Sequence, residues 1–247
     1  MRRKLKQYSG GTLFIVLITL GLASAQEIAP PSDEQVKERL SFIENALRAA
    51  QPRARAWWYG WIGGYSAGAI IQGGLSAANW NKKDKRDFAE DMIVGSATCA
   101  LGVGGLLIEP FSPAFAPHRL KVIPEGTAEE RRAKLLKAED LLRACAQREK
   151  AGQGWLTHLL NLGANVAGGL VTVYVFDRSW STGLVTFAIS ESVSLLNIYS
   201  QPRRAIRDLH NYEITYSERQ GAPRTEPGEG HWFFSVFPGG FTVRLLF

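Results

Sequence analysis

The feature that most constrains this 247-residue chain is an internal repeat. Residues 44–75 recur in register at residues 139–170, which is an offset of 95. Farther along, the Glu-Pro of residues 109–110 aligns with the Gln-Pro of residues 201–202, so the offset has slipped to 92 and the second copy is three residues shorter. The pattern indicates a tandem duplication of a unit of roughly 90 residues, and two copies of one unit are expected to share a fold and to pack about a pseudo-twofold axis.

The two units are predicted at residues 33–118 and 128–210. Each comprises an amphipathic helix followed by an apolar helical hairpin rich in Gly and Ala, so the expected fold class is mainly α. In the first unit, apolar side chains recur at helical spacing from Val36 to Ala50, and Pro52 is expected to limit this helix.

The repeat also predicts which positions are equivalent. β-branched residues leave strands as an alternative at residues 169–176 and 183–189. The aligned first copy is rich in Gly and Ala instead, which favours helix in both copies. Two aligned pairs are expected at equivalent buried positions: Leu47 with Leu142, and Leu75 with Leu170.

The N-terminus has the three parts of an export signal. A basic start precedes an apolar run from Leu13 to Ala23, and Ala23-Ser24-Ala25 has the small-x-small form of a cleavage site. Residues 1–25 are therefore predicted to be a signal peptide, with an uncleaved anchor helix as the alternative. Because this segment carries four basic and no acidic residues, the formal net charge falls from +6 to +2 without it. No nucleic-acid partner is expected for the mature chain.

The tail, residues 211–247, is predicted to be a linker and a β-hairpin. Tyr212, Ile214 and Tyr216 alternate with polar residues, which suggests a strand. Two seven-residue apolar-aromatic runs then flank the Pro-Gly-Gly of residues 238–240, which is a strong hairpin signal.

The last strand alternates Phe241, Val243, Leu245 and the terminal Phe247 with other residues. This pattern resembles the C-terminal strand signal of bacterial outer-membrane β-barrel proteins. The resemblance covers about seven residues and implies assembly at the outer membrane. A small sheet that caps the helices is the alternative.

Small residues follow a membrane-type spacing in the apolar hairpins. Residues separated by four positions lie on one helix face, where small side chains let helices approach closely, as in a glycine zipper. The predicted helix-packing glycines are Gly60, Gly64, Gly68, Gly163 and Gly168.

Aromatic residues bracket the same helices, as expected for side chains in the lipid headgroup zone. The 24 residues from Trp57 to Trp80 would span about 36 Å, enough for a bilayer core of about 30 Å. Membrane lipid is therefore an expected partner, and a tightly packed soluble bundle is the alternative. The predicted interfacial residues are Trp57, Trp58, Trp61, Trp80, Trp155 and Trp180.

Glu191 is the ionisable residue of greatest interest, because it lies in an otherwise uncharged segment. A carboxylate inside a membrane must be paired or face water, which makes it a functional candidate. Arg178 or the basic residues after Pro202 are its possible partners, and a Glu on the wet face of a helix is the alternative. The two cysteines, Cys99 and Cys145, read as small buried residues, although a bridge between them is possible.

The sequence contains no catalytic motif, metal-spaced cluster, phosphate loop or dinucleotide fingerprint. We expect a non-enzymatic, membrane-associated protein of the bacterial cell envelope with a structural, pore-forming or transport-related role, without cofactor or metal. Expected partners are a second copy of the chain or other envelope proteins. The alternatives are a soluble periplasmic bundle that binds an apolar ligand or partner, and a membrane-embedded enzyme that uses Glu191.

Overall fold

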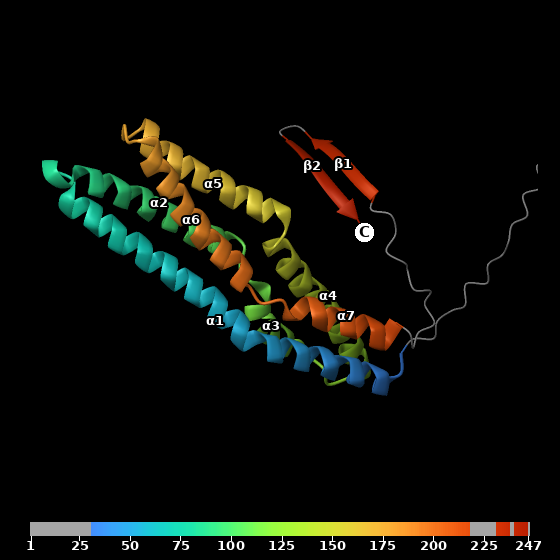
Figure 1. Ribbon diagram of the computed structural model, residues 1–247. Helices are drawn as coiled ribbons and strands as arrows, with labels where there is room; N and C mark the ends of the chain where they lie inside the picture. The colour runs from blue at the N-terminus through green and yellow to red at the C-terminus, as the bar shows by residue number, and fades with distance from the viewer. Residues whose placement is uncertain (1–30, 218–230, 238–239, 247) are drawn as a thin grey trace, which may run out of the picture. The chain divides into compact units, whose positions relative to one another are not determined.

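The computed structural model describes residues 31–217 and the backbone of two strands at residues 231–237 and 240–246 (Figure 1). The described part of the chain is mainly helical, as predicted. Residues 169–174 and 183–189 are helical, not extended. In chain order, the helices are α1 (Asp33–Asn79), η1 (Lys83–Lys85), α2 (Arg86–Ile108), η2 (Ser112–Ala114), α3 (Ala116–Lys121), α4 (Ala128–Gly152), α5 (Trp155–Tyr174), α6 (Trp180–Ser200) and α7 (Arg204–Ser217).

The two strands are β1 (His231–Phe237) and β2 (Gly240–Leu246), which pair antiparallel. Their side chains lie outside the described residues, as do Phe247 and the whole of residues 1–30. The C-terminal strand signal and the export signal therefore stay predictions.

Helix α1 is longer than the sequence predicts. It begins at Asp33, where the Ser32 side chain accepts a hydrogen bond from the backbone N–H of Gln35, and it continues through Pro52 to Asn79. A proline inside a helix removes one backbone hydrogen bond. Here Pro52 is exposed, as is Arg48 one turn earlier, so water can solvate the carbonyl that loses its partner. The expectation that the helix is limited at Pro52 is wrong for this reason.

The N-terminal half of α1 packs with α3, α4 and α7 around a hydrophobic core, and we call this part the head. Its interior is mainly apolar but also holds the charged residues Lys134, Glu139 and Glu149. Leu47 and Leu142, which were expected at equivalent buried positions, are 2% and 1% exposed. The largest apolar contributors are Val36, Leu40, Ile43, Leu47, Leu120, Leu135, Leu142, Tyr212 and Tyr216.

Helix α7 occupies the segment where a strand was expected. Tyr212 and Tyr216 are four residues apart and face the head core side by side, whereas Ile214 is exposed. Arg39 Nε donates to the Tyr212 hydroxyl at 2.7 Å, and that hydroxyl is also hydrogen-bonded to Glu139. The strand prediction was wrong because a three-residue alternation does not distinguish a strand from two tyrosines one turn apart on a helix.

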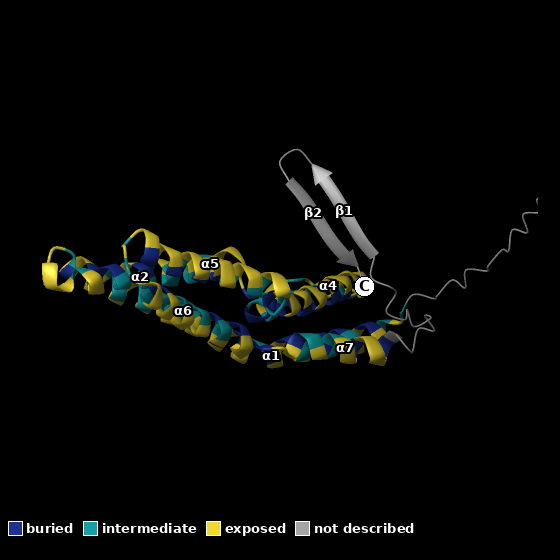
Figure 2. Ribbon diagram, turned by 45° about the horizontal axis from the view of Figure 1, so that its top comes forward, coloured by how far each residue is buried: buried dark blue, intermediate teal, exposed yellow. Residues whose placement is uncertain are grey.

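The rest of α1, from Trp57 onward, packs with α2, α5 and α6, and we call this part the apolar bundle. Here many large apolar residues are exposed, for example Leu160, Leu184 and Leu196 of α5 and α6, and much of these two ribbons has the colour of exposed residues in Figure 2. Leu75 and Leu170 are each 41% exposed, so the expectation that this pair is buried is wrong. The pair is nevertheless equivalent in its exposure.

The same order of elements occurs twice along the chain. Helix α1 corresponds by alignment to α4 followed by α5, with the chain turning at residues 153–154 in the second copy. Helix α6 corresponds to α2, and α7 to α3. At one aligned pair, a fully buried Glu149 stands where the first half has the buried Ala54.

Glu149 joins α4 to the start of α7. Its carboxylate accepts a hydrogen bond from the backbone N–H of Ile206 at 3.0 Å, while its other oxygen is buried without a partner. Burial raises the pKa of this carboxyl to about 7, and the nearby Asp208 carboxylate acts in the same direction. The folded state therefore holds a proton that the unfolded chain, with a carboxyl pKa near 4.5, releases.

This raised pKa predicts a stability that decreases as pH rises from about 4.5 through about 7, because the folded state binds more protons in that window. The neutral isostere Glu149→Gln lacks this dependence. It should match the wild type near pH 4.5 and exceed it at pH 8 by up to about 3 kcal/mol. Thermal unfolding of both proteins in detergent at the two pH values measures the difference, and parallel pH profiles would contradict the assignment.

Candidate functional site

The residue singled out by the sequence, Glu191, belongs to a small polar cluster between α5 and α6. Asn165 Nδ2 donates to Glu191 Oε2 at 2.8 Å and to Ser194 Oγ at 2.9 Å. Asn165 and Ser194 are buried, and Glu191 is half-buried. The sequence reasoning missed Asn165, although an amide near the middle of an uncharged helix, facing the hairpin partner, was the available signal.

The first hairpin holds a similar contact at the aligned position. Cys99 aligns with Glu191, and Gln72 Nε2 on the preceding helix donates to Cys99 Sγ at 3.6 Å. Each apolar hairpin thus contains an amide side chain that donates to its second helix, with one such bond in the first hairpin and two in the second. Both cysteines are free thiols, and burial raises the pKa of the Cys145 thiol in the head to about 12.

Arg178 does not pair with Glu191. It lies in the connector between α5 and α6, where its guanidinium contacts Asp87 at 3.0 Å and Asp91 at 3.6 Å on α2. Glu191 is eleven residues farther along α6 than Trp180, which is about 16 Å of helix and beyond the reach of an arginine. The predicted pairing is wrong because the two residues occupy different levels of the hairpin.

The predicted packing glycines divide into two groups. A side chain added at Gly68 would meet Cys99, and one at Gly168 would meet Thr98 and Val94 of α2. No atom lies within 4 Å of such a side chain at the remaining three positions, Gly60, Gly64 and Gly163. A closer approach, missed by the sequence analysis, joins Gly169 of α5 and Gly183 of α6, where an added Cβ on either residue would lie 2.9 Å from the carbonyl oxygen of the other.

The tryptophans also divide. Trp57 and Trp58 are buried, and their indole N–H groups donate to the carbonyl oxygens of Asn197 and Leu106, so they fasten α1 to α6 and α2. Trp61 Nε1 donates to Ser200 Oγ at 3.0 Å.

Trp80 lies under the Arg86 guanidinium, 3.7 Å from it. Trp155 and Trp180 are exposed at the starts of α5 and α6, so only these two match the predicted outward placement closely.

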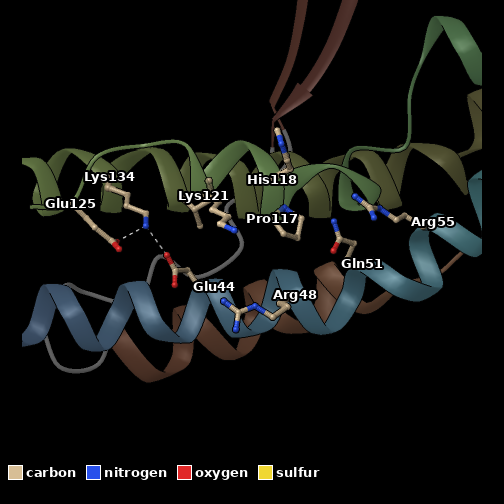
Figure 3. Close-up of a pocket in the computed structure, with 10 residues that line it drawn as sticks. Glu44, Arg48, Gln51, Arg55, Pro117, His118, Lys121, Glu125 and Lys134 are labelled. Atoms are coloured by element: carbon tan, nitrogen blue, oxygen red, sulfur yellow. Dashed lines mark hydrogen bonds and ion pairs between the residues drawn. The ribbon is translucent and has the colours of Figure 1, made fainter.

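A groove of about 560 Å³ lies in the head between α1, α3 and α4 (Figure 3). At one end, the buried Lys134 ammonium binds Glu44 at 2.7 Å and Glu125 at 2.5 Å, so the two carboxylates are committed to one cation. Arg48, Arg55, His118 and Lys121 also line the groove, so its lining carries a net positive charge. We call this the first groove.

A second groove, of about 660 Å³, lies between α4 and α7. Its Lys150 and His210 align with Arg55 and His118 of the first groove, at offsets of 95 and 92. Arg203 and Arg207 add positive charge, and Glu213 is the one carboxylate among the residues that line this groove. The sequence analysis did not single out either groove, because each is assembled from segments far apart in the chain.

Within residues 31–217, no three His, Cys, Asp or Glu side chains are grouped so that they could hold a metal ion. No protein-family model, curated protein or solved structure was found to match the chain.

The cluster at Glu191 predicts unequal effects for its two partners. Asn165→Leu removes the only described donor to the carboxylate and should lower stability by about 1–3 kcal/mol. Glu191→Gln keeps an acceptor for Asn165 and should stay close to wild type. The matched control is Asn161→Leu, one turn earlier on α5, whose amide bonds only to its own helix at Thr157. Melting temperatures in detergent test this, and an equal loss in both leucine variants would exclude the cluster as a stabilising unit.

Proposed function

We propose that this chain is a non-enzymatic integral protein of the bacterial cell envelope with a structural role. In this proposal the apolar bundle lies in the bilayer and the head lies in water. The single observation that carries it is the unequal exposure of apolar side chains in the two parts. The head packs most of its leucines into a core, whereas the apolar bundle exposes many large apolar side chains, such as Ile70, Leu160 and Leu196.

Length and composition support the same assignment. Residues 83–108 and α5 are each long and apolar enough to cross a membrane. In their most apolar stretches, 11% and 17% of the residues are buried, whereas the core helix of a soluble protein would be mostly buried. Isolated exposed leucines are normal in soluble proteins, but continuous apolar faces mark contact with lipid or protein.

The buried polar groups of the apolar bundle favour a structural role over a pore. Ser76 Oγ donates to the Ala89 carbonyl oxygen at 2.8 Å, and Ser96 Oγ to that of Ala69 at the same distance. Together with the Asn165 cluster, these bonds satisfy polar atoms between neighbouring helices, as expected in a bilayer. We further propose that the two halves arose by tandem duplication, that residues 1–25 direct export, and that the chain assembles with copies of itself or with other envelope proteins.

Membrane insertion predicts very different costs for two equally exposed sites. Ile189, at the middle of α6, is 63% exposed, and Leu136, on the head helix α4, is 64% exposed. Arginine at the centre of a membrane helix costs about 2.5–3.5 kcal/mol of insertion free energy, whereas most surface substitutions in water stay within about 0.5 kcal/mol. Ile189→Arg should therefore reduce the membrane-integrated protein strongly, and Leu136→Arg should not.

The measurement is the amount of protein left in the membrane pellet after alkaline carbonate extraction of cells that express each variant. Wild type and Leu136→Arg are expected in the pellet. Release of the wild type by carbonate would refute the integral placement and favour the soluble periplasmic alternative. Equal retention of Ile189→Arg and Leu136→Arg would place Ile189 outside the bilayer.

The C-terminal resemblance leads to a separate proposal, that the hairpin β1–β2 serves outer-membrane assembly. Burial of one Phe side chain contributes about 1.5–3 kcal/mol. Deletion of Phe247 should cost far more than this if the residue is part of an assembly signal, and the protein should disappear from the outer membrane. Phe247→Tyr, which keeps a terminal aromatic ring, should localise normally. Membrane fractionation decides, since an unchanged outer-membrane level in the deletion variant rules out the signal.

A further inference from the structure

We propose that the first and second grooves bind the phosphate-bearing headgroups of anionic lipids. This inference rests on the proposed membrane placement, and it adds a ligand class and two sites to it. The phosphate could reach the grooves from lipid or from solution, and the structure favours lipid for the reasons below.

The first groove has uncompensated positive charge. Glu44 and Glu125 are both within 2.7 Å of Lys134, which leaves no free carboxylate among the groove's lining residues. Arg55 Nε donates to the Ala114 carbonyl oxygen at 3.1 Å, which fixes its guanidinium beside the groove. Arg48 and Lys121 approach from α1 and α3, and neither makes an ion pair with a described residue (Figure 3). Guanidinium and ammonium groups that line one hollow are suited to a phosphate.

The second groove shares two of its lining residues with the first by alignment, although Glu213 stands at the position of Lys121. Lys150 and His210 stand at the positions of Arg55 and His118, although the two copies have otherwise diverged around them. Arg203 adds an exposed cation that makes no described ion pair. Two separate hollows, built from corresponding segments, thus present a basic residue and a histidine in corresponding places.

Both grooves lie where the head meets the apolar bundle. Arg55 comes two residues before Trp57, the first residue of the apolar half of α1, and Lys150 comes five residues before Trp155. Arg203 follows α6, whose last turn carries the exposed Tyr199. If the apolar helices are in the bilayer, these cations lie at headgroup depth, where exposed aromatic rings and basic pockets between helices are favourable.

The exposed apolar faces begin next to the grooves. Leu156 and Leu159, both 53% exposed, lie within two turns of Gln153, which lines the second groove. An acyl chain attached to a bound headgroup would have an apolar surface to follow there. A soluble phosphate would gain nothing from this surface, which is why lipid is the favoured source.

The test uses the full-length protein in nanodiscs of phosphatidylcholine with about 20% phosphatidylglycerol, which supplies an anionic headgroup. After mild delipidation, native mass spectrometry identifies the lipids that the protein retains. The groove variants are Arg48→Gln with Lys121→Gln, and Lys150→Gln with Arg203→Gln. None of these four side chains makes a described hydrogen bond, so the fold should be kept. The control, Arg132→Gln with Lys137→Gln, removes the same charge from exposed positions of α4 outside both grooves.

The wild type should retain phosphatidylglycerol in preference to phosphatidylcholine. In each groove double variant, the amount of retained phosphatidylglycerol should fall at least about five-fold, which is the factor for one basic contact at a membrane surface. In the control variant it should change little. Equal losses in control and groove variants would overturn the proposal, as would equal retention of the two lipids. Displacement of the retained lipid by glycerol phosphate at millimolar concentration would overturn lipid as the source.

Carbonate extraction of the same variants separates this inference from the proposed function. Groove variants that stay in the membrane pellet but retain wild-type amounts of phosphatidylglycerol would overturn the headgroup sites alone. A wild-type protein released by carbonate would remove the membrane placement, and the lipid sites with it.

Discussion

The rest of the structure depends on α1, a single unbroken helix whose apolar residues are buried in its first half and largely exposed in its second half. Its first half buries Val36, Ile43 and Leu47 and exposes charges, and its second half exposes Ile70 and Ile71. The change takes place at Trp57 and Trp58, whose rings are buried and whose N–H groups are bonded to α6 and α2. These two residues hold the junction in register, so the head and the apolar bundle are joined through α1.

The same change of environment accounts for which polar groups are buried. In the head, a buried cation such as Lys134 is compensated by two carboxylates, because water is near and charged partners are available. In the apolar bundle, the buried polar residues are mostly neutral, namely Asn165, Ser194 and Ser76, and they bond to one another, to Glu191 or to backbone. Neutral hydrogen-bonded groups cost less to bury than charges do.

The sequence predicted the helical fold class and the pairing of Leu47 with Leu142, because both follow from helical periodicity. It predicted burial of Leu75 and Leu170 wrongly, since periodicity identifies an apolar face but not whether that face meets protein or lipid. It missed the Gly169–Gly183 contact and the two grooves, which depend on how separate helices approach. It also offered Arg178 as one candidate partner of Glu191, whereas Arg178 contacts Asp87 and Asp91 on α2.

Several aligned positions of the two halves differ in chemistry. Cys99 and Glu191 each accept a bond from an amide on the preceding helix, and Ala54 and Glu149 are each buried beside the segment that follows the hairpin. In both pairs the acidic residue is in the second copy. The two grooves, in contrast, have a basic residue and a histidine at aligned positions in both halves. Divergence at the buried positions changes stability and local electrostatics, and retention of charge at the junction is what a shared contact with one membrane surface would require.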